Sequence, residues 1–201
     1  EMKRYVLKSP FEGARENELK FESIKKFDDK KDKFWEKVQT RYPVSIYRNV
    51  EYLNWRYAQN PLSPYFCFVL KDGGDIKSLV VLKFENARDE NGQIQMKVAR
   101  IIDFVSEEGF EILVLKKVIE FSKSQKADFI DYFSSGDFHK ESFLKAGFFD
   151  GSLADFSSLP ILLNPISQKR KTYNFAVKKN PKAKLGDCYT TKGGGDIDRP
   201  R

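Results

Sequence analysis

The sequence contains little histidine or cysteine, and each scarcity removes a class of function. Only His139 among the 201 residues is a histidine, which excludes multi-histidine metal sites and argues against a histidine-based triad. We therefore predict no bound metal. The two cysteines, Cys67 and Cys188, lie far apart, which predicts reduced thiols and a cytoplasmic protein. No apolar run approaches the ~18 residues of a membrane span, so we expect no membrane segment.

The chain does contain enough apolar sequence for a folded core. Hydrophobic residues make up 40% of it and aromatic residues 14%, which argues against disorder. A chain of this length suits one domain of roughly 150 residues plus an appendage. We expect an N-terminal extension or remnant of a preceding domain at residues 1–20 and one domain at residues 21–192. A flexible tail, opened by three glycines, is expected at residues 193–201.

The formal net charge of +7 suggests nucleic-acid binding, but the charges are mixed along the chain. Residues 25–33 mix lysine with aspartate, a pattern typical of a solvated helix start. Only residues 168–184 are basic without acidic interruption, and such a segment suits a phosphate-bearing ligand or a nucleic-acid backbone. No zinc-finger, helix-turn-helix or RNP-type motif accompanies it. A nucleic-acid partner is therefore the weakest hypothesis.

The first fifty residues predict two short strands and a helix. Residues 4–7 and 21–27 are strand-like. The helix that follows is capped at Asp28 or Asp29, and its large apolar residues recur at the spacing of one buried face. It ends before Pro43, since a proline disfavours helix in the residue before it.

A second helix is expected from Asn49 to Asn60. Helical neighbours are turned by about 100°, so Leu53 and Trp55 point to nearly opposite sides. We expect Leu53 to be buried and Trp55 or Arg56 to bind substrate. An aromatic face stacks on a sugar ring or adenine, and a guanidinium grips a carboxylate or phosphate. A purely structural clamp is the equally open alternative for this pair.

A β-meander is predicted next. Residues 65–71 and 76–84 are β-rich and are joined by Asp-Gly-Gly-Asp at residues 72–75, a strong hairpin signal. A third strand at residues 94–105 follows a turn at residues 89–92.

Residues 98–149 are the most informative part of the chain, because a strand runs through a tight acidic turn directly into a helix. Helix amides that point back at a strand end make a ready anion or cofactor site. The full order predicts an α+β fold with one mixed central sheet flanked by helices. After the meander, the expected elements are a helix at residues 110–126, a strand at 127–133, a helix at 139–146, and two further strands at 159–163 and 172–178.

This order resembles the GNAT acyltransferase superfamily over residues 25–192. The tract from Arg48 to Pro61 with Tyr65 beyond it, and the closing Gly-Asp-Ile-Asp-Arg-Pro at residues 195–200, are similar to segments of GNAT-like proteins from bacterial surface-polysaccharide clusters. The resemblance implies a GNAT-like mixed central sheet and the C-terminal half of a protein with two GNAT-like halves. It also implies that acyl-coenzyme A lies where the third meander strand splays from the next strand.

Two departures from the family pattern concern the cofactor. The family holds the pyrophosphate on a loop of the form Gln/Arg-x-x-Gly-x-Gly/Ala, but in residues 106–111 only Gly109 matches. Glu107 and Glu108 each stabilise the helix dipole by roughly 0.3–1 kcal/mol and oppose a bound pyrophosphate. Phe143 stands where the family often has a tyrosine that protonates the leaving thiolate, and phenylalanine has no proton to give. Together they indicate a degenerate or unconventional GNAT half.

Three residues are candidates for acid–base chemistry. Asp103, at the end of the splayed strand, would receive the proton of a substrate amine, with its pKa raised by apolar neighbours. Its alternative role is a hydrogen bond to a turn. Glu107 lies on the same rim, with helix capping as its alternative. Tyr132 would donate a proton if it faces the cleft, and would otherwise be a buried tyrosine with a satisfied hydroxyl.

The main hypothesis is an N-acyltransferase that moves an acyl group from acetyl-coenzyme A, or another acyl-coenzyme A, to an amino sugar or other small amine, with polysaccharide metabolism as the setting that the resemblance implies. Catalysis would be positioning plus proton removal. The alternative is a catalytically silent GNAT-like module that binds the substrate or a partner, such as a second GNAT-like domain of the parent chain. The cofactor contacts that the resemblance implies are Phe104, Val105, Ser106, Gly109 and Phe110.

Overall fold

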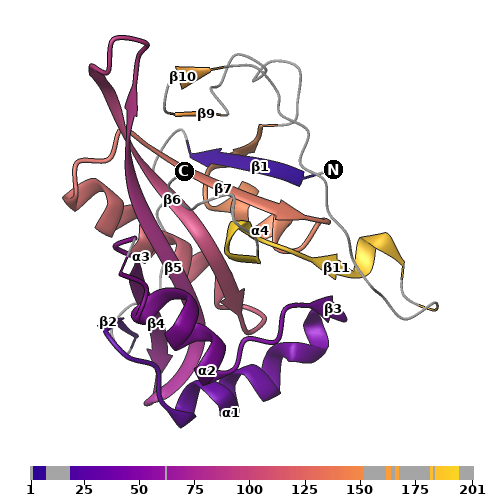
Figure 1. The fold of residues 1–201 in the computed structure, drawn as a ribbon. Helices are drawn as coiled ribbons and strands as arrows, with labels where there is room; N and C mark the ends of the chain where they lie inside the picture. Colours follow the sequence, from indigo (N-terminus) through magenta and orange to yellow (C-terminus); the bar gives the residue numbers. More distant parts are fainter. Residues whose placement is uncertain are drawn as a thin grey trace.

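The computed structural model describes residues 2–7, 19–61, 63–151, 162–163, 166–167, 182 and 184–194. Within these ranges the chain forms a mixed sheet flanked by helices (Figure 1), so the predicted α+β fold is confirmed. None of the helices described is long and apolar enough to cross a membrane.

Seven strands of the described residues form one sheet in the order β2-β4-β5-β6-β7-β1-β8. All neighbours are antiparallel except β6 and β7, which are parallel. The hairpin predicted at residues 72–75 is present, because Asp72 pairs with Asp75. The strands are β1 (Met2–Leu7), β2 (Lys20–Ile24), β4 (Phe66–Asp72), β5 (Asp75–Arg88), β6 (Ile94–Ser106), β7 (Phe129–Ser135) and β8 (Phe148–Asp150).

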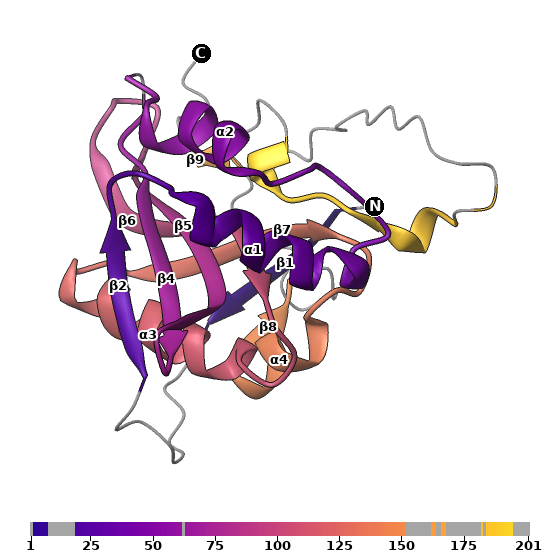
Figure 2. The same cartoon turned by 90° about the horizontal axis from the view of Figure 1, so that it is seen from below.

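Helices cover both faces of the sheet (Figure 2). On one face lie α1 (Asp29–Val38), which begins at the predicted cap Asp28, and α2 (Val50–Leu53), which continues into a π-helical turn, η2 (Asn54–Ala58). On the other lie α3 (Glu111–Ser124) and α4 (Lys140–Lys145). Each layer has its own apolar cluster, one around Val81, Ile102 and Tyr57 and the other around Ile101, Val118 and Phe143.

The structure places several other expected segments differently from the expectation or does not describe them. The described part of the strand expected at residues 159–163 is β9 (Leu162–Leu163), which pairs with β10 (Ile166–Ser167) in a separate two-stranded sheet. The strand expected at residues 172–178 lies outside the described residues. Residues 2–7 of the expected extension join the main sheet as β1. The first two glycines of the expected flexible tail belong to a 3-10 turn, η5 (Lys192–Gly194), in which the Gly194 N–H donates to the Thr191 carbonyl at 3.0 Å.

Candidate functional site

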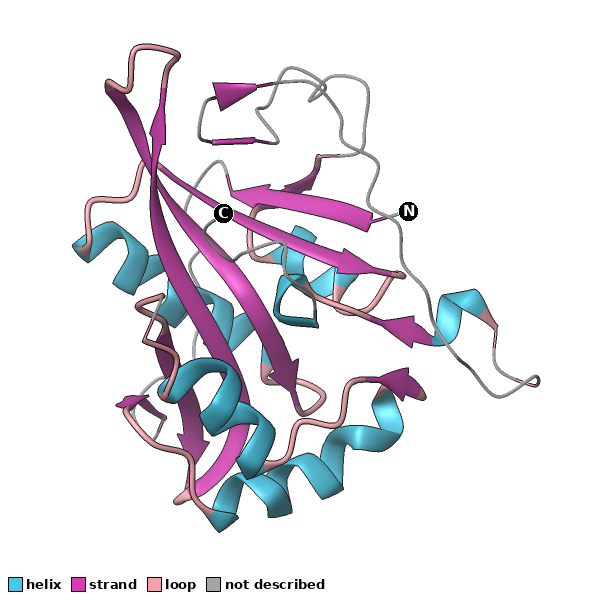
Figure 3. Ribbon diagram, in the orientation of Figure 1, coloured by secondary structure: helices cyan, strands magenta, loops and turns pink. Residues whose placement is uncertain are grey.

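The strands β6 and β7 pair over only part of their length. Their register runs from Val98 opposite Phe129 to Ile101 opposite Tyr132. Beyond that point the two strands diverge (Figure 3), although β6 continues to Ser106 and β7 continues to residue 135. The splay that the resemblance implied is therefore present, and we call the space between these strand ends the gap.

A β-bulge at the start of the gap sets the direction of Asp103. Val81 of β5 pairs with Asp103, but the next residue, Leu82, pairs with Ile101, so Ile102 is the extra residue on β6. A bulge re-aims the side chains that follow it. As a result Asp103 faces the layer of α2 and η2, whereas Phe104 packs into the cluster beneath α3.

The chain's own residues 188–194, which we call the C-terminal segment, fill the gap. Thr191 forms a bridge with Ser134 of β7. The Ser135 N–H donates to the Thr190 carbonyl at 2.8 Å, and the Ser135 hydroxyl donates to the Cys188 carbonyl at 2.6 Å. On its other side the segment pairs as β11 (Cys188–Tyr189) with β3 (Val44–Ser45). It thus behaves as an additional strand between the diverging ends.

Tyr189 is the largest side chain of the segment and is fully buried. Its hydroxyl donates to the Phe104 carbonyl of β6 and lies 2.7 Å from the Tyr132 hydroxyl of β7. Its ring stacks on Tyr42 with centroids 4.6 Å apart, and Phe138 covers it at 5.0 Å. One tyrosine therefore joins both strands that border the gap.

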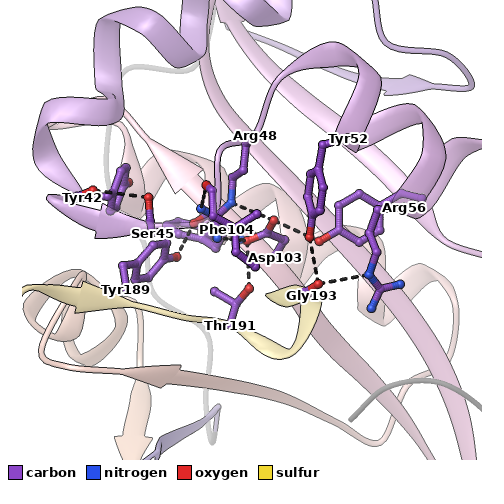
Figure 4. Close-up of polar contacts among 12 residues, drawn as sticks. Tyr42, Ser45, Arg48, Tyr52, Arg56, Asp103, Phe104, Tyr189, Thr191 and Gly193 are labelled. Atoms are coloured by element: carbon purple, nitrogen blue, oxygen red, sulfur yellow. Dashed lines mark hydrogen bonds and ion pairs between the residues drawn. The ribbon is translucent and has the colours of Figure 1, made fainter. Parts of the chain in front are cut away.

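Asp103 is the polar centre of the site (Figure 4). Its carboxylate accepts two hydrogen bonds from the Arg48 guanidinium, at 2.9 and 3.1 Å. It also accepts from the Tyr57 hydroxyl, the Thr191 hydroxyl and the Phe104 N–H, each at 3.0 Å. The side chain is 1% exposed. In this arrangement the carboxylate is a buried clamp, and no free lone pair faces an open cleft as a proton acceptor would require.

Arg56 and Trp55 have opposite environments. Arg56 is 2% exposed; its Nε donates to the Gly193 carbonyl at 3.0 Å and its Nη1 to the Tyr65 hydroxyl at 2.9 Å. Trp55 is 60% exposed, whereas Leu53 is buried, as the helical spacing predicted. Arg56 therefore binds the C-terminal segment itself, and substrate contact by either residue stays a prediction.

The loop expected to hold a pyrophosphate is occupied by a carboxylate of the chain. The Glu111 side chain accepts from the Gly109 N–H at 2.8 Å and pairs with Arg41 at 2.8 Å. Burial raises the pKa of Glu111, but hydrogen bonds from His139 and Arg41 outweigh it and bring the pKa to about 2. A negative charge thus already sits on the start of α3, where a second anion would be repelled.

The sole histidine adjoins this loop. His139 Nδ1 lies 3.6 Å from the Glu111 carboxylate, and Nε2 lies 2.8 Å from the Tyr42 hydroxyl. Burial lowers the pKa of His139, against the smaller raising effect of Glu111. Burial also raises the pKa of Tyr42 to about 12. The Tyr42 hydroxyl accepts from the Ser106 N–H at 3.2 Å. Tyr42, His139 and Glu111 therefore form a network that contacts the end of β6.

Glu107 lies on the outer rim of the loop. Its carboxylate pairs with Lys37 at 2.8 Å and with Lys77 at 3.7 Å. It borders a pocket of about 340 Å³ whose other lining residues are Lys30, Lys33, Phe34, Lys37, Gly74, Asp75 and Ile76. To act in acid–base chemistry, the Glu107 carboxylate would have to do so while paired with two lysines. Glu108 is exposed beside it.

The remaining cofactor candidates are mostly inside the protein. Phe104, Val105 and Ser106 are buried, and the Ser106 hydroxyl lies 2.7 Å from the Ser78 hydroxyl. Phe110 is half-buried at the N-terminus of α3, beneath the Lys77 ammonium. Three of these four residues are therefore inside the protein and not on an open surface.

Tyr132 and Phe143 pack against each other. Their rings stack with centroids 4.4 Å apart, and Phe143 also contacts Phe104 and Phe148 edge-on. Burial raises the pKa of Tyr132. The Tyr132 hydroxyl points to Tyr189 and not to an open cleft, so the expected proton donor is a buried tyrosine with a partner.

Sequence reasoning missed the partners that determine these environments. Arg48 lies in the tract that carries the resemblance, yet it is 55 positions from Asp103, and no local pattern pairs the two. Tyr189 is 85 positions from Phe104. Glu111 offered a usable signal, because an acidic residue in the first helical turn two positions after a glycine is placed to cap the preceding amides.

No family model matches this sequence, and no curated protein matches it. Among solved structures it is similar to one described as a GCN5-related N-acetyltransferase from Anabaena variabilis, with a TM-score of 0.47 and 12% identity over 66% of this chain and 32% of that chain. It is also similar to a functionally unknown conserved protein from Staphylococcus epidermidis, with a TM-score of 0.45 and 11% identity over 74% of this chain and 57% of that one. This chain therefore spans less than two thirds of either neighbour.

The residues of the gap do not fit an acyl-coenzyme A in this conformation. A pantetheine arm between β6 and β7 would need the positions that Tyr189 and Thr191 hold by hydrogen bonds to both strands. A pyrophosphate would need the amide that Glu111 already caps. The mismatch therefore concerns both places where the resemblance implies cofactor contact: the gap between β6 and β7, and the loop at the start of α3.

Proposed function

We propose that this chain is a GNAT-like module that is catalytically silent and serves as a binding or interaction domain. The observation that carries the proposal is the closure of the gap by residues 188–194. The partner that suits the proposal is the second GNAT-like domain implied by the sequence resemblance. Acyl transfer would then be carried out outside this domain.

The buried surface of Tyr189 allows an order-of-magnitude estimate of the free energy that keeps the gap closed. A tyrosine buries on the order of 150–250 Å², which at about 25 cal/mol per Å² amounts to about 4–6 kcal/mol. A ligand that must first expel this side chain loses that free energy from its own binding. At about 1.4 kcal/mol per tenfold, a micromolar cofactor would become millimolar or weaker. The closed gap therefore supports a silent module over an enzyme.

An N-acyltransferase that uses acyl-coenzyme A is the second candidate. The divergence of β6 and β7 next to the start of α3 favours it, because that geometry suits an extended amide chain and an anion. In this candidate the C-terminal segment leaves the gap, and Asp103 or Glu107 takes the proton of an amino sugar or other small amine. The cytoplasm and polysaccharide metabolism remain its proposed setting.

Calorimetric titration of the full chain with acetyl-coenzyme A tests the proposal. We expect no saturable binding at up to about 1 mM, because the expected loss is about a thousandfold or more. The matched variant is Glu107→Gln with Glu108→Gln, which removes the rim charge and leaves the segment in place. For a silent module this variant also fails to bind. Saturable binding by the unaltered chain, strengthened about fivefold in the variant, would establish the second candidate instead.

A further inference from the structure

We propose that the gap between β6 and β7 is a peptide-recognition groove whose ligand is the chain's own C-terminal segment. The ligand class is an extended peptide with the pattern Tyr-x-Thr-Lys-Gly, which this chain supplies at residues 189–193. The inference rests on the proposed function, because it names what the binding module binds.

The walls of the groove hold one another without the segment. Asp103 keeps both hydrogen bonds from Arg48, one from Tyr57 and one from the Phe104 amide when Thr191 is left out of account. Arg56 likewise keeps the Tyr65 hydroxyl, and its guanidinium lies over the Tyr65 ring at 5.6 Å. A site whose polar groups are fixed before the ligand arrives loses little entropy on binding.

Each defined position of the pattern meets a different kind of group. The Tyr189 ring enters an aromatic box of Tyr42 and Phe138, with the Arg48 guanidinium 5.2 Å from its centroid. The Thr191 hydroxyl donates to Asp103. The peptide is therefore read by shape at its first position and by charge-assisted hydrogen bonding at its third.

The last two positions are read by charge and by size. The Lys192 ammonium lies 4.1 Å from the centroid of the Phe133 ring and 4.0 Å from the Asp131 carboxylate. A Cβ at Gly193 would clash with the buried Tyr57 hydroxyl, so glycine is required there. The Gly193 carbonyl accepts from Tyr52 and Arg56, both at 3.0 Å. The fifth position of the pattern is therefore recognised through its backbone carbonyl and through the absence of a side chain.

A long stretch of sequence, which includes β9 and β10, separates the segment from the last strand of the main sheet. The last strand of the main sheet ends at Asp150, and residues 151–183 separate it from the segment. Most of the segment's hydrogen bonds go to residues of β6, β7 and η2, far away in sequence. These contacts place the segment as a ligand in the groove, and in the proposal it leaves the groove while the main sheet stays folded.

The two cysteines provide a direct test in the full-length chain. Cys188 lies in the segment and Cys67 in β4, and both are free and buried. Under native conditions we expect a thiol reagent to label Cys188 well before Cys67. Thr191→Val removes the hydrogen bond to Asp103 and should speed Cys188 labelling about tenfold or more, with Cys67 still protected. The matched control is Thr190→Val, because Thr190 takes part through its backbone N–H, which donates to Ser135.

A synthetic peptide of Gly186–Gly194 that carries C188S tests recognition itself. Added to the Thr191→Val chain, it should compete for the groove and increase Cys188 labelling, whereas the same peptide with T191V should not. If Cys188 and Cys67 are labelled simultaneously, at the rate of global unfolding, the proposal is overturned. The labelling rates of the two cysteines in the unaltered chain give this test even if Thr191→Val fails to fold. Equal effects of Thr190→Val and Thr191→Val would also overturn it. Acetyl-coenzyme A binding by the unaltered chain would defeat the proposed function alone.

Discussion

At the scale of single residues, the pair of Arg48 and Asp103 is a buried ion pair at the centre of the candidate site. Both side chains are almost fully buried, at 2% and 1% exposure. Taking two charges out of water costs several kcal/mol per ion, and the loss is offset only when the geometry and the remaining hydrogen bonds are good. Tyr57 and Thr191 supply those hydrogen bonds. The pair therefore stabilises the fold only as long as both partners are present.

Asp103→Asn should accordingly destabilise the protein strongly. Asparagine keeps the size of the side chain but leaves the Arg48 guanidinium buried and uncompensated, which typically costs about 3–5 kcal/mol. Urea unfolding followed by circular dichroism measures the loss. The control is Asp75→Asn, since the Asp75 side chain is 84% exposed and its change should lie within about 0.5 kcal/mol. An Asp103→Asn variant as stable as the unaltered chain would contradict the clamp and reopen the acid–base role.

His139 makes stability depend on pH in a predictable direction. Burial lowers its pKa below the ordinary 6.5, so the unfolded chain binds a proton more readily than the folded one. Its contribution to stability is present above about pH 6.5 and is lost as the pH falls towards the folded pKa. Because the chain has no other histidine, its ring proton gives an unambiguous NMR titration.

We expect the midpoint of that titration below 6.5 and, in Glu111→Gln, lower still. Glu111 is the group that raises the pKa of His139, so its neutral replacement removes the opposing effect. A midpoint at or above 6.5 in the unaltered chain would contradict the burial of the ring as described.

At the scale of elements, the second helix shows what periodicity captures and what it omits. The 3.6-residue repeat placed Leu53 and Trp55 on opposite sides, and their exposures agree. The same repeat puts Arg56, three residues after Leu53, near the buried face, so a charge there was a signal for an internal partner. The partner itself, the Gly193 carbonyl, is 137 positions away and has no local signature. Asn54 reaches the Phe27 backbone over 27 positions in the same way.

Alanine substitutions at neighbouring positions of this helix should separate the two environments. Arg56→Ala removes the hydrogen bonds to the Gly193 carbonyl and the Tyr65 hydroxyl, and we expect a loss of about 2 kcal/mol or more. Trp55→Ala should change stability by about 0.5 kcal/mol or less, because most of the indole faces solvent. Guanidinium unfolding curves of the two variants provide the comparison, and equal losses would show that the helix faces are wrongly assigned.

The sequence predicted where the gap lies, but it did not predict the direction of Asp103 or the residues that fill the gap. A strand end followed by a tight turn and a helix located the gap, and Gly109, with a φ of +86°, marks the turn. The bulge at Ile102 that turns Asp103 away from α3 leaves no signal in the sequence pattern. Nor does any short-range pattern reveal that Tyr189 fills the gap. Local sequence encodes elements, whereas the contents of a site depend on long-range contacts.

At the scale of the whole molecule, both ends of the described chain enter the main architecture. The N-terminal strand β1 lies between β7 and β8, and residues 188–194 lie between the diverging ends of β6 and β7. The local sequence of residues 4–7 indicated a strand, but local sequence carries no information on strand order. The position of β1 between β7 and β8 therefore became known only from the strand pairing in the structure.

The position of β1 yields a prediction about proline. Val6 pairs with Asp131 of β7 on one side and with Phe149 of β8 on the other, so its backbone lies in the interior of the sheet. Proline there has no N–H to donate and leaves a neighbouring carbonyl without its partner, so Val6→Pro should cost about 1–3 kcal/mol. Val6→Ile keeps the N–H and the β-branched shape and serves as the control. Loss of β1 would also expose the edge of β7, and sedimentation should then detect self-association of the proline variant alone. If Val6→Pro unfolds in urea at the same midpoint as Val6→Ile and stays monomeric, residues 2–7 do not hold this place in the sheet.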